Sequence, residues 1–424
     1  MRIGISTRFE YEKFWGVDPG VEAKMHRIHA YPAKFPAFIT PKAIEYARHE
    51  GVNVEIIADI FCGCGTTALE ANKLGINFWG CDINPIATLI ARTKSKKYKS
   101  EKLETYKNQI MEEFTNIDVK QYDLEKMNSR IRYWYEKNQI IDLLKLKKSI
   151  EAVLPKNSHY KSFFLCAFSN ILKSTSKWLT KSIKPQIDPY KKPADVVYAF
   201  NEHYKFMYSA NEENVYTKCS KSEIIEGNIL KMKFKKSFVD LLITSPPYVT
   251  SYEYADLHQL STLWLQVVDD YRELRKGTIG SVFSKYDYIK GDKSIIEPGD
   301  KIVDRLDKVD TGKAKAVYKY FKDMQEVTNK CFSMVNPGGM VFFVIGNTEY
   351  KGVQIHNSEH LLNSLAYAGF KNLKKIKRKI YNKNLPPYRD EIGRFTTDKT
   401  KRKIYSEEFI VVGRKPCEQP RNLF

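Results

Sequence analysis

A strand, a glycine-rich turn, a helix and a second strand are predicted in succession between residues 55 and 82, and this unit constrains the fold most strongly. The apolar run 55–60 predicts the first strand, the turn carries Gly63 and Gly65, and the second strand ends in Asp82. This order is typical of a nucleotide-binding βαβ unit, in which glycines let the backbone approach a ligand closely. A Walker-type phosphate loop is excluded because no Lys-Ser or Lys-Thr pair follows the glycines.

The acidic end of the second strand has two interpretations. Asp82 lies seventeen residues beyond Gly65, where a carboxylate grips the ribose diol of a bound nucleotide cofactor. The alternative is that Asp82 caps the helix expected to start at Asn84-Pro85. The ribose interpretation is favoured, and both NAD and S-adenosylmethionine (SAM) would satisfy it.

Strands and helices alternate again after an interruption. The five later strands are predicted over Ser222–Ile229, Phe238–Ile243, Met340–Ile345, Lys371–Ile380 and Glu408–Val412. Helices are predicted over 257–268, 301–334 and 357–368, and the stop signal at 336–339 ends the second of them. Seven strands with helices between the first six indicate an α/β fold. We expect the seven-stranded, Rossmann-like fold of class I SAM-dependent methyltransferases, with a helical insertion.

The interruption covers residues 96–219. Its Lys/Glu-rich, apolar-periodic sequence predicts two or three helices to about residue 180 and another to about residue 210. The methyltransferase domain is therefore expected to be discontinuous, over 26–95 and 220–424. The basic insertion either contacts DNA and reads the target sequence or forms a solvated helical cap, and the sequence leaves both open. Residues 250–300 are expected to form an exposed loop region on the substrate side.

The net charge favours a polyanionic partner. Seventy Lys and Arg residues outnumber fifty Asp and Glu residues, which gives a charge of +20 and a pI near 9.3. Such a field favours nucleic acid, although a lysine-rich proteome with ordinary solvated surfaces would give the same count. Seven cysteines without a CxxC pair indicate reduced thiols and a cytoplasmic protein. No apolar run is long enough to predict a membrane span, and no signal-peptide pattern opens the chain.

The fourth predicted strand ends abruptly in Thr244-Ser245-Pro246-Pro247-Tyr248. Both prolines have a fixed φ and no N–H, so the corner is stiff and its carbonyl groups are free to accept hydrogen bonds. A hydroxyl before the corner and an aromatic ring after it make a small, rigid socket that is polar and able to stack. A proline-stiffened loop with a packed tyrosine is the purely structural alternative.

In their order and spacing, the glycine motif and the Ser-Pro-Pro-Tyr corner resemble those of DNA amino-methyltransferases of restriction–modification systems, specifically the cytosine-N4 class. The resemblance covers about residues 26–95 and 222–413. The family's glycine motif is similar to residues 59–65, its ribose-gripping acid to Asp82 and its catalytic motif to residues 245–248. Residues 29–36 resemble the segment that closes over the methionine end of SAM, and residues 336–339 resemble a later motif that leads into a strand.

The resemblance implies a site-specific enzyme that transfers a methyl group from SAM to the N4 amine of cytosine in duplex DNA by base flipping. It also implies a possible cognate restriction endonuclease as a partner. Catalytic roles are implied for Ser245, Pro246, Pro247 and Tyr248. Cofactor contacts are implied for Phe35, Asp59, Phe61, Gly63, Gly65, Asp82, Ile83, Asn228 and Thr244. Asn228 departs from the Asp of many relatives, but an amide can still bond an adenine edge.

Other activities are weighed against this one. Carbon-5 cytosine methylation is excluded because it needs a cysteine after a proline at the fourth strand, and the only Pro-Cys pair is at residues 416–417. Adenine-N6 methylation is less favoured because those enzymes usually carry Asp or Asn in place of Ser245. An RNA guanine-amine methyltransferase, a non-catalytic DNA-binding subunit and a dehydrogenase are the further alternatives.

No metal site is predicted. The run from His356 to His360 fits the H-x-x-E-H pattern of zinc peptidases, but no third ligand is evident. Cys62, Cys64 and Cys81 lie near the glycine turn without the second pair that a zinc site requires, so they are expected to be small packing residues.

Overall fold

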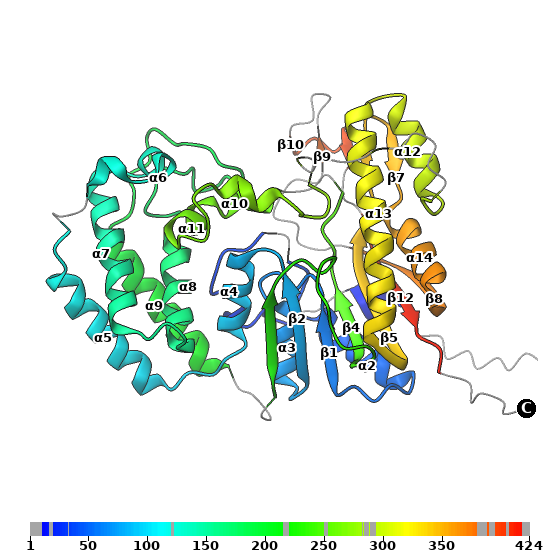
Figure 1. Cartoon of the computed structure of the whole chain (residues 1–424), viewed down its shortest axis with the longest axis horizontal. Helices are drawn as coiled ribbons and strands as arrows, with labels where there is room; N and C mark the ends of the chain where they lie inside the picture. Colours follow the sequence, from blue (N-terminus) through cyan, green and yellow to red (C-terminus); the bar gives the residue numbers. More distant parts are fainter. Residues whose placement is uncertain are drawn as a thin grey trace, which may run out of the picture.

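A seven-stranded sheet forms the centre of the molecule in the computed structural model, with the strand order β3-β2-β1-β4-β5-β12-β8 (Figure 1). Neighbouring strands from β3 to β5 are parallel, whereas β12 is antiparallel to both β5 and β8. This is the seven-stranded Rossmann-like fold of class I SAM-dependent methyltransferases, and the predicted fold class is confirmed. The structure describes residues 11–16, 20–32, 34–119, 123–214, 220–249, 253–281, 283, 288, 294–379, 388–389, 395–403 and 407–417.

All seven predicted strands are strands of this sheet. They are β1 (Ile56–Asp59), β2 (Asn77–Asp82), β3 (Ser222–Glu226), β4 (Val239–Thr244), β5 (Val335–Gly346), β8 (Lys371–Lys379) and β12 (Glu407–Arg414). Short strands form two smaller sheets, one of β6 (Thr348–Tyr350) with β7 (Val353–Ile355), the other of β9 (Tyr388–Arg389), β10 (Phe395–Thr396) and β11 (Arg402–Lys403).

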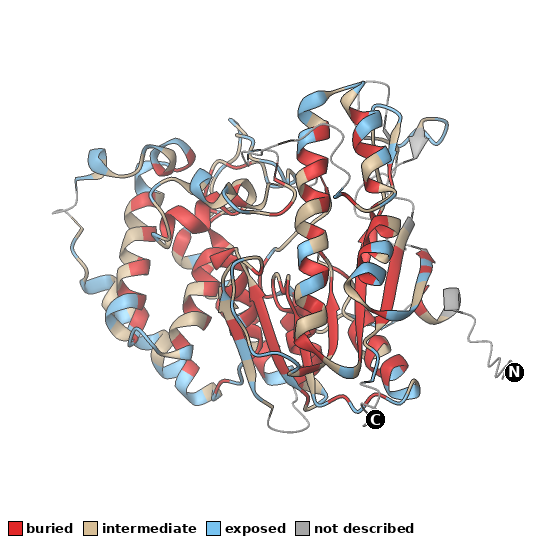
Figure 2. Ribbon diagram, turned by 45° about the vertical axis from the view of Figure 1, so that its right-hand side comes forward, coloured by how far each residue is buried: buried red, intermediate tan, exposed pale blue. Residues whose placement is uncertain are grey.

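Helices cover both faces of the sheet, because successive side chains of its strands point to opposite sides. In β5, Val341, Phe343 and Ile345 belong to the apolar cluster that contains α12 (Gly299–Asp307), α13 (Thr311–Met334) and α14 (Asn357–Ala368). The alternating residues Met340, Phe342 and Val344 belong to the cluster that contains α1 (Tyr11–Gly16), α2 (Ile39–His49) and α3 (Thr66–Lys73). The strands are therefore buried from both sides (Figure 2).

The insertion lies beside the β3 end of the sheet and α4 (Pro85–Lys94) (Figure 1). It consists of α5 (Ser100–Asn116), α6 (Ser129–Trp134), α7 (Lys137–Val153), α8 (His159–Ile171) and α9 (Val196–Glu213), with the short 3-10 turn η2 (Leu124–Lys126). Two or three helices were expected before residue 180, and the described part of this stretch has four. Helices α6 and α8 begin separately because each has its own N-cap. The side chains of Asn128 and Ser158 accept hydrogen bonds from backbone N–H groups in the first turns of α6 and α8, respectively.

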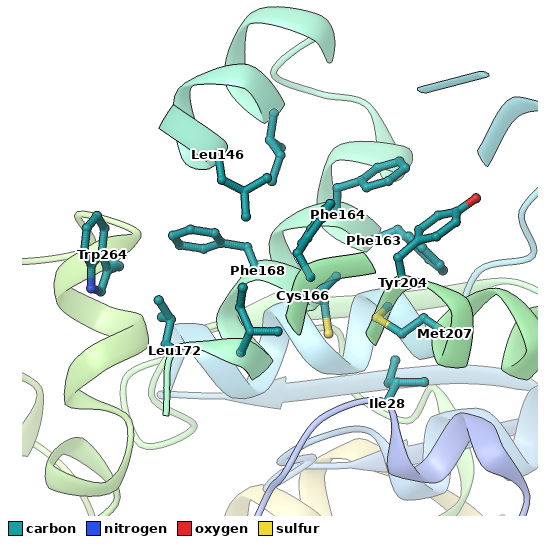
Figure 3. Close-up of a cluster of buried hydrophobic side chains, with 14 of the residues drawn as sticks. Ile28, Leu146, Phe163, Phe164, Cys166, Phe168, Leu172, Tyr204, Met207 and Trp264 are labelled. Atoms are coloured by element: carbon teal, nitrogen blue, oxygen red, sulfur yellow. The ribbon is translucent and has the colours of Figure 1, made fainter. Parts of the chain in front are cut away.

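The helical insertion shares its apolar core with the rest of the molecule. Phe163, Phe164 and Phe168 of α8 lie at its centre, with Tyr204 of α9 and Trp264 of α11 (Gln259–Trp264) packed around them (Figure 3). Ile86 and Ile90 of α4 belong to the same cluster, which also packs against α11. The insertion is thus fixed to the sheet domain by a continuous hydrophobic core.

Two predicted helices are divided in the structure. The helix expected over 257–268 is α10 (Tyr254–Leu257) and α11, followed by the 3-10 turn η3 (Tyr271–Arg275). The helix expected over 301–334 is α12 and α13, because the Asp310 side chain accepts a hydrogen bond from the Lys313 backbone N–H and starts a second helix. A further 3-10 turn, η1 (Lys24–Arg27), precedes α2.

Two strand boundaries also differ from the prediction. The third strand ends at Glu226 rather than Ile229, because the Asn228 side chain accepts from the Leu230 N–H and closes a turn. Residues 336–339, expected to separate a helix from a strand, lie inside β5, where the register with β4 shifts. Part of the loop region expected over 250–300 lies outside the described residues.

Within the described part of the chain, the helices are all too short or too polar to cross a membrane.

Candidate functional site

A pocket of about 1000 Å³, counting the space of its open mouth, lies where the carboxyl ends of β1, β2, β3 and β4 meet. The carboxyl edge of a parallel sheet, where its strand order reverses, is where this fold class binds its ligands. Of the residues predicted for the site, the pocket is lined by Phe35, Phe61, Gly63, Asp82, Ile83, Asn228, Ser245 and Pro247. The structure therefore brings the glycine loop, the acidic strand end and the proline corner to one cavity.

The loop after β1 depends on glycine at two positions with positive φ. Gly63 has φ +47° and Gly65 has φ +79°, a region that favours glycine over other residues. A Cβ atom on Gly65 would lie 2.8 Å from the Cα of Ala91 in α4, so the loop and that helix can pack only without a side chain here. A Cβ on Gly63 would lie 3.5 Å from the Tyr31 ring, an ordinary contact at the pocket wall.

Asp82 accepts a hydrogen bond from the backbone of this loop and lines the pocket. One carboxylate oxygen accepts from the Gly63 N–H at 2.8 Å, and the other accepts from the Asn84 N–H at 2.8 Å. Burial raises its pKa to about 6. The helix-cap interpretation of Asp82 is wrong, because Asn84 caps α4 by accepting from the N–H groups of Ile86 and Ala87. Each oxygen of Asp82 keeps a lone pair for a ligand.

Asp59 joins the glycine loop to the corner after β4. One oxygen accepts from the Thr244 hydroxyl at 2.6 Å and from the Phe61 N–H at 3.2 Å, and the other accepts from the Thr67 hydroxyl at 2.8 Å. Burial raises the pKa of Asp59 to about 6. Asp59, Gly65 and Thr244 are absent from the pocket wall, so the structure places these three predicted cofactor residues underneath it, where they support its shape.

The proline corner is fixed to the strands on its far side. The Ser245 hydroxyl donates to the carbonyl oxygen of Val344 in β5 at 2.9 Å, and Pro246 is buried. The Tyr248 hydroxyl donates to Glu408 in β12 at 3.1 Å. Burial, with Glu408 beside it, holds the pKa of the Tyr248 phenol well above its usual value. Tyr248 is not among the pocket-lining residues, so its ring lies next to the pocket and outside its wall.

The sequence predicted an aromatic wall of the pocket only in part. Tyr31 and Tyr254 both line it, with ring centroids 6.3 Å apart and an interplanar angle of 16°. Tyr31 also stacks with the His258 ring, with the ring centroids 5.1 Å apart and an interplanar angle of 22°. Tyr31 belongs to the segment 29–36 that was expected beside SAM, but nothing in the sequence indicated that Tyr254, 223 residues further along the chain, would stack with it.

Asn228 connects two loops at the pocket mouth. Its amide N–H donates to the Gly277 carbonyl at 3.0 Å, and its amide oxygen accepts from the Leu230 N–H at 2.9 Å. The segment from Leu274 of η3 to Ile279, which this bridge holds, forms part of the wall.

The H-x-x-E-H pattern does not assemble a metal site among the described residues. The His360 ring is buried 3.2 Å from the side-chain oxygen of Gln325, and its pKa is lowered to about 3 by burial. Glu359 forms an ion pair with Lys375. These side chains hold α14 against α13 and β8.

Comparison with known proteins finds similarity to DNA methylases. Residues 6–93 match the DNA methylase family model. The type II methyltransferase M.MvaI of Kocuria varians is 25% identical over 394 residues, which cover 85% of this chain and 85% of that protein. M.MjaII, a type II methyltransferase of Methanocaldococcus jannaschii, is 42% identical over 80 residues, which cover 19% of this chain and 14% of that protein. The chain is therefore a methyltransferase related to the DNA methylases.

Among solved structures, a SAM-dependent methyltransferase from Methanosarcina mazei aligns over 92% of this chain and 100% of its own, at 10% identity and a TM-score of 0.30. That likeness is too distant to bear on function.

SAM is the cofactor of this methyltransferase, and the residues of the pocket fit it. Asp82 offers a carboxylate with free lone pairs, which suits a ribose diol. Phe35, Phe61 and Ile83 offer apolar surface for a flat base. The same cavity reaches Ser245 and Pro247, so a bound methyl donor would lie beside the proline corner.

Proposed function

We propose that this methyltransferase transfers the methyl group of SAM to the exocyclic N4 amine of cytosine in duplex DNA, at a specific sequence, as the modification enzyme of a restriction–modification system. The observation that carries the proposal is the hydrogen bond that the Ser245 hydroxyl donates. Its hydrogen is donated to the Val344 carbonyl, so the oxygen presents only lone pairs to the pocket that it lines.

An acceptor is what the chemistry requires at this position. The exocyclic amine of a base is a poor nucleophile because its lone pair is delocalised into the ring. Acceptors at the Ser245 hydroxyl and the Pro246 carbonyl would bind its two N–H groups and turn the lone pair out of conjugation. SAM supplies, when bound, a methyl group on a sulfonium that is a good leaving group. The remaining contribution of the protein is positioning, which can supply several kcal/mol of the barrier.

The residue types of the corner favour an amine and, among amines, cytosine N4. Cys62 and Cys81 are buried thiols, and burial raises the pKa of both. They are unsuited to the nucleophilic attack that carbon-5 methylation needs. Serine at position 245, where adenine-N6 enzymes usually carry Asp or Asn, favours cytosine over adenine.

We infer that the target base leaves the duplex to reach the corner, since a base inside the helix cannot present its amine to a recessed pocket. Tyr248 would stack on the extruded base, a contact worth about 1–3 kcal/mol. The net charge of +20 supports DNA as the partner. The helical insertion over 96–219 and the loops of 250–300 are the proposed DNA-contacting regions, and the cytoplasmic location and a cognate endonuclease belong to the same proposal.

The test is to incubate the protein with labelled SAM and duplex DNA, digest the DNA and identify the methylated nucleoside by mass spectrometry. N4-methylcytosine is expected. N6-methyladenine alone would overturn the choice of base, and label in RNA alone would overturn the choice of DNA. A Ser245→Ala preparation made in parallel identifies any label that comes from a contaminating enzyme.

A further inference from the structure

A row of three polar side chains lies behind the proline corner. The Tyr248 hydroxyl donates to one oxygen of Glu408 at 3.1 Å, and the other oxygen of Glu408 lies 2.7 Å from Nε of Arg378. Both charged side chains are withdrawn from water, at 13% exposure for Glu408 and 3% for Arg378. The 2.7 Å contact is an ion pair rather than an aligned hydrogen bond, since it fails the angle that a hydrogen bond requires.

The row is built by strand register. In the antiparallel pairing of β12 with its two neighbours, Glu408 stands opposite Arg378 of β8 and opposite Gly346 of β5. Glycine at position 346 puts no side chain beside Glu408 on that strand. Because β12 runs against the parallel strands, its first residues lie at the same edge as the end of β4 (Figure 1). Glu408 is thereby placed at the edge that carries the pocket.

Stability alone gives a weak reason for this arrangement. A buried ion pair loses the hydration of both charges, and replacing it with apolar residues is often neutral or stabilising. A phenol that donates to a carboxylate, in contrast, forms a directional hydrogen bond. With Ser245 bound to β5 and Tyr248 bound to β12, both ends of the corner are fixed to strands.

We propose that Glu408 is a positioning residue for methyl transfer: it fixes the phenol of Tyr248, and so the plane of the ring that stacks on the target base, while Arg378 forms an ion pair with the second oxygen of the Glu408 carboxylate. The inference rests on the proposed function, because it assigns Tyr248 to the target base. It adds two residues from the last strands of the sheet to a site otherwise formed by β1 to β4 and their loops.

The first experiment removes only the hydroxyl. Tyr248→Phe keeps the ring and loses the hydrogen bond, and we expect the single-turnover rate of methyl transfer to fall about tenfold while SAM affinity stays unchanged. Tyr204→Phe is the matched control, because that phenol also donates to a carboxylate, Glu104, at 2.9 Å within the helical insertion. The control should transfer methyl groups at the wild-type rate.

The second experiment asks whether Glu408 acts through that hydroxyl. Glu408→Gln keeps an acceptor and loses the charge, so we expect a loss smaller than that of Tyr248→Phe. In the Tyr248→Phe background the same change should have no further effect on the rate. An equal loss in both backgrounds, or a wild-type rate for Tyr248→Phe, would overturn the inference.

Folding and function are separated by a third variant. Arg378→Met/Glu408→Gln leaves no unpaired buried charge and keeps an amide oxygen for Tyr248 to bond. We expect it to fold, to bind SAM and to transfer methyl groups at about the rate of Glu408→Gln. A much slower rate with an intact fold would assign Arg378 a role of its own and overturn its role as a charge partner. If the wild-type protein methylates no nucleic acid, the proposed function fails; if it does and these variants match it, only this inference fails.

Discussion

The loop after β1 and the corner after β4 end neighbouring parallel strands, and they form two adjacent walls of one pocket by different means. The β1 loop needs the absence of side chains: Gly63 and Gly65 have positive φ, and Gly65 packs directly on α4. The β4 corner needs particular groups in fixed orientations, since the Ser245 and Tyr248 hydroxyls are each bound to a strand behind them. The first arrangement suits binding a cofactor, and the second suits orienting an amine.

One carboxylate connects the two. Asp59 accepts from Thr67 in the helix after the glycine loop and from Thr244 directly before the corner. The cofactor wall and the catalytic wall are therefore adjacent but separable: changes in the loop should act on SAM affinity and stability, and changes in the corner should act on the rate of transfer.

The largest effect is expected from Gly65→Ala. The added Cβ would meet the Ala91 backbone at 2.8 Å in a left-handed conformation, and we expect a loss of about 3 kcal/mol in the free energy of unfolding. Gly51 has a similar φ of +81°, but a Cβ added there would have no atom within 4 Å. Gly51→Ala should therefore lose only about 1 kcal/mol in the free energy of unfolding. Urea unfolding measures both. Equal losses would contradict close packing of the loop on α4.

Ser245→Ala should lower the single-turnover rate of methyl transfer about 100-fold, because an acceptor for the amine is lost, with SAM affinity within about twofold of wild type. The matched control is Ser149→Ala, another hydroxyl that donates to a backbone carbonyl, at 2.8 Å within α7. Rapid-quench assays and calorimetry give the two quantities. A parallel loss of SAM binding would show that the two walls are not separable.

The raised pKa of the Asp59 carboxyl group predicts that the free energy of unfolding depends on pH. Its pKa is raised from 3.8 to about 6 in the folded protein, so the protonated form is favoured by folding. The stability it contributes is complete below pH 3.8 and is lost as the pH rises through 6. Relative to Asp59→Asn, the wild type should lose about 2 kcal/mol between pH 4 and pH 7. Urea unfolding at several pH values checks this, and a difference that stays constant or grows with pH would refute it.

The smallest effect is expected from Asn228→Ala, which removes the bridge from Asn228 to Gly277 at the pocket mouth. SAM affinity should fall about fivefold with little change in the transfer rate, since one or two ordinary hydrogen bonds are lost. Asn128→Ala is matched to it, because Asn128 accepts from the N–H two residues on and donates to the distant carbonyl of Asp269. Calorimetry should find the control indistinguishable from wild type.

The contrast between the walls also explains what could be predicted from sequence. The glycines, Asp82 and the Ser-Pro-Pro-Tyr corner are local patterns, and the strands beside them have a clear apolar signature, so the fold and eight of the pocket-lining residues were predicted. The break between α12 and α13 was missed because it depends on one capping carboxylate, that of Asp310.

Long-range partners could not be predicted. The hydrogen bond from Thr244 to Asp59 joins residues 185 positions apart, and that from Tyr248 to Glu408 joins residues 160 apart. Such contacts follow from strand order and register, which local patterns leave undetermined. For the same reason the sequence assigned Asp59 to cofactor contact, when its oxygens are taken up by Thr67, Thr244 and the Phe61 N–H beneath the pocket.

The division between the two walls is tested most directly by single-turnover methyl transfer at saturating SAM in Gly63→Ala and Ser245→Ala. The Cβ of Gly63→Ala would face the pocket without a clash, so this variant should bind SAM weakly. We predict that saturation restores its rate to within a few-fold of wild type, whereas Ser245→Ala stays about 100-fold slower. The opposite result, with Ser245→Ala recovering and Gly63→Ala remaining inactive, would contradict the account.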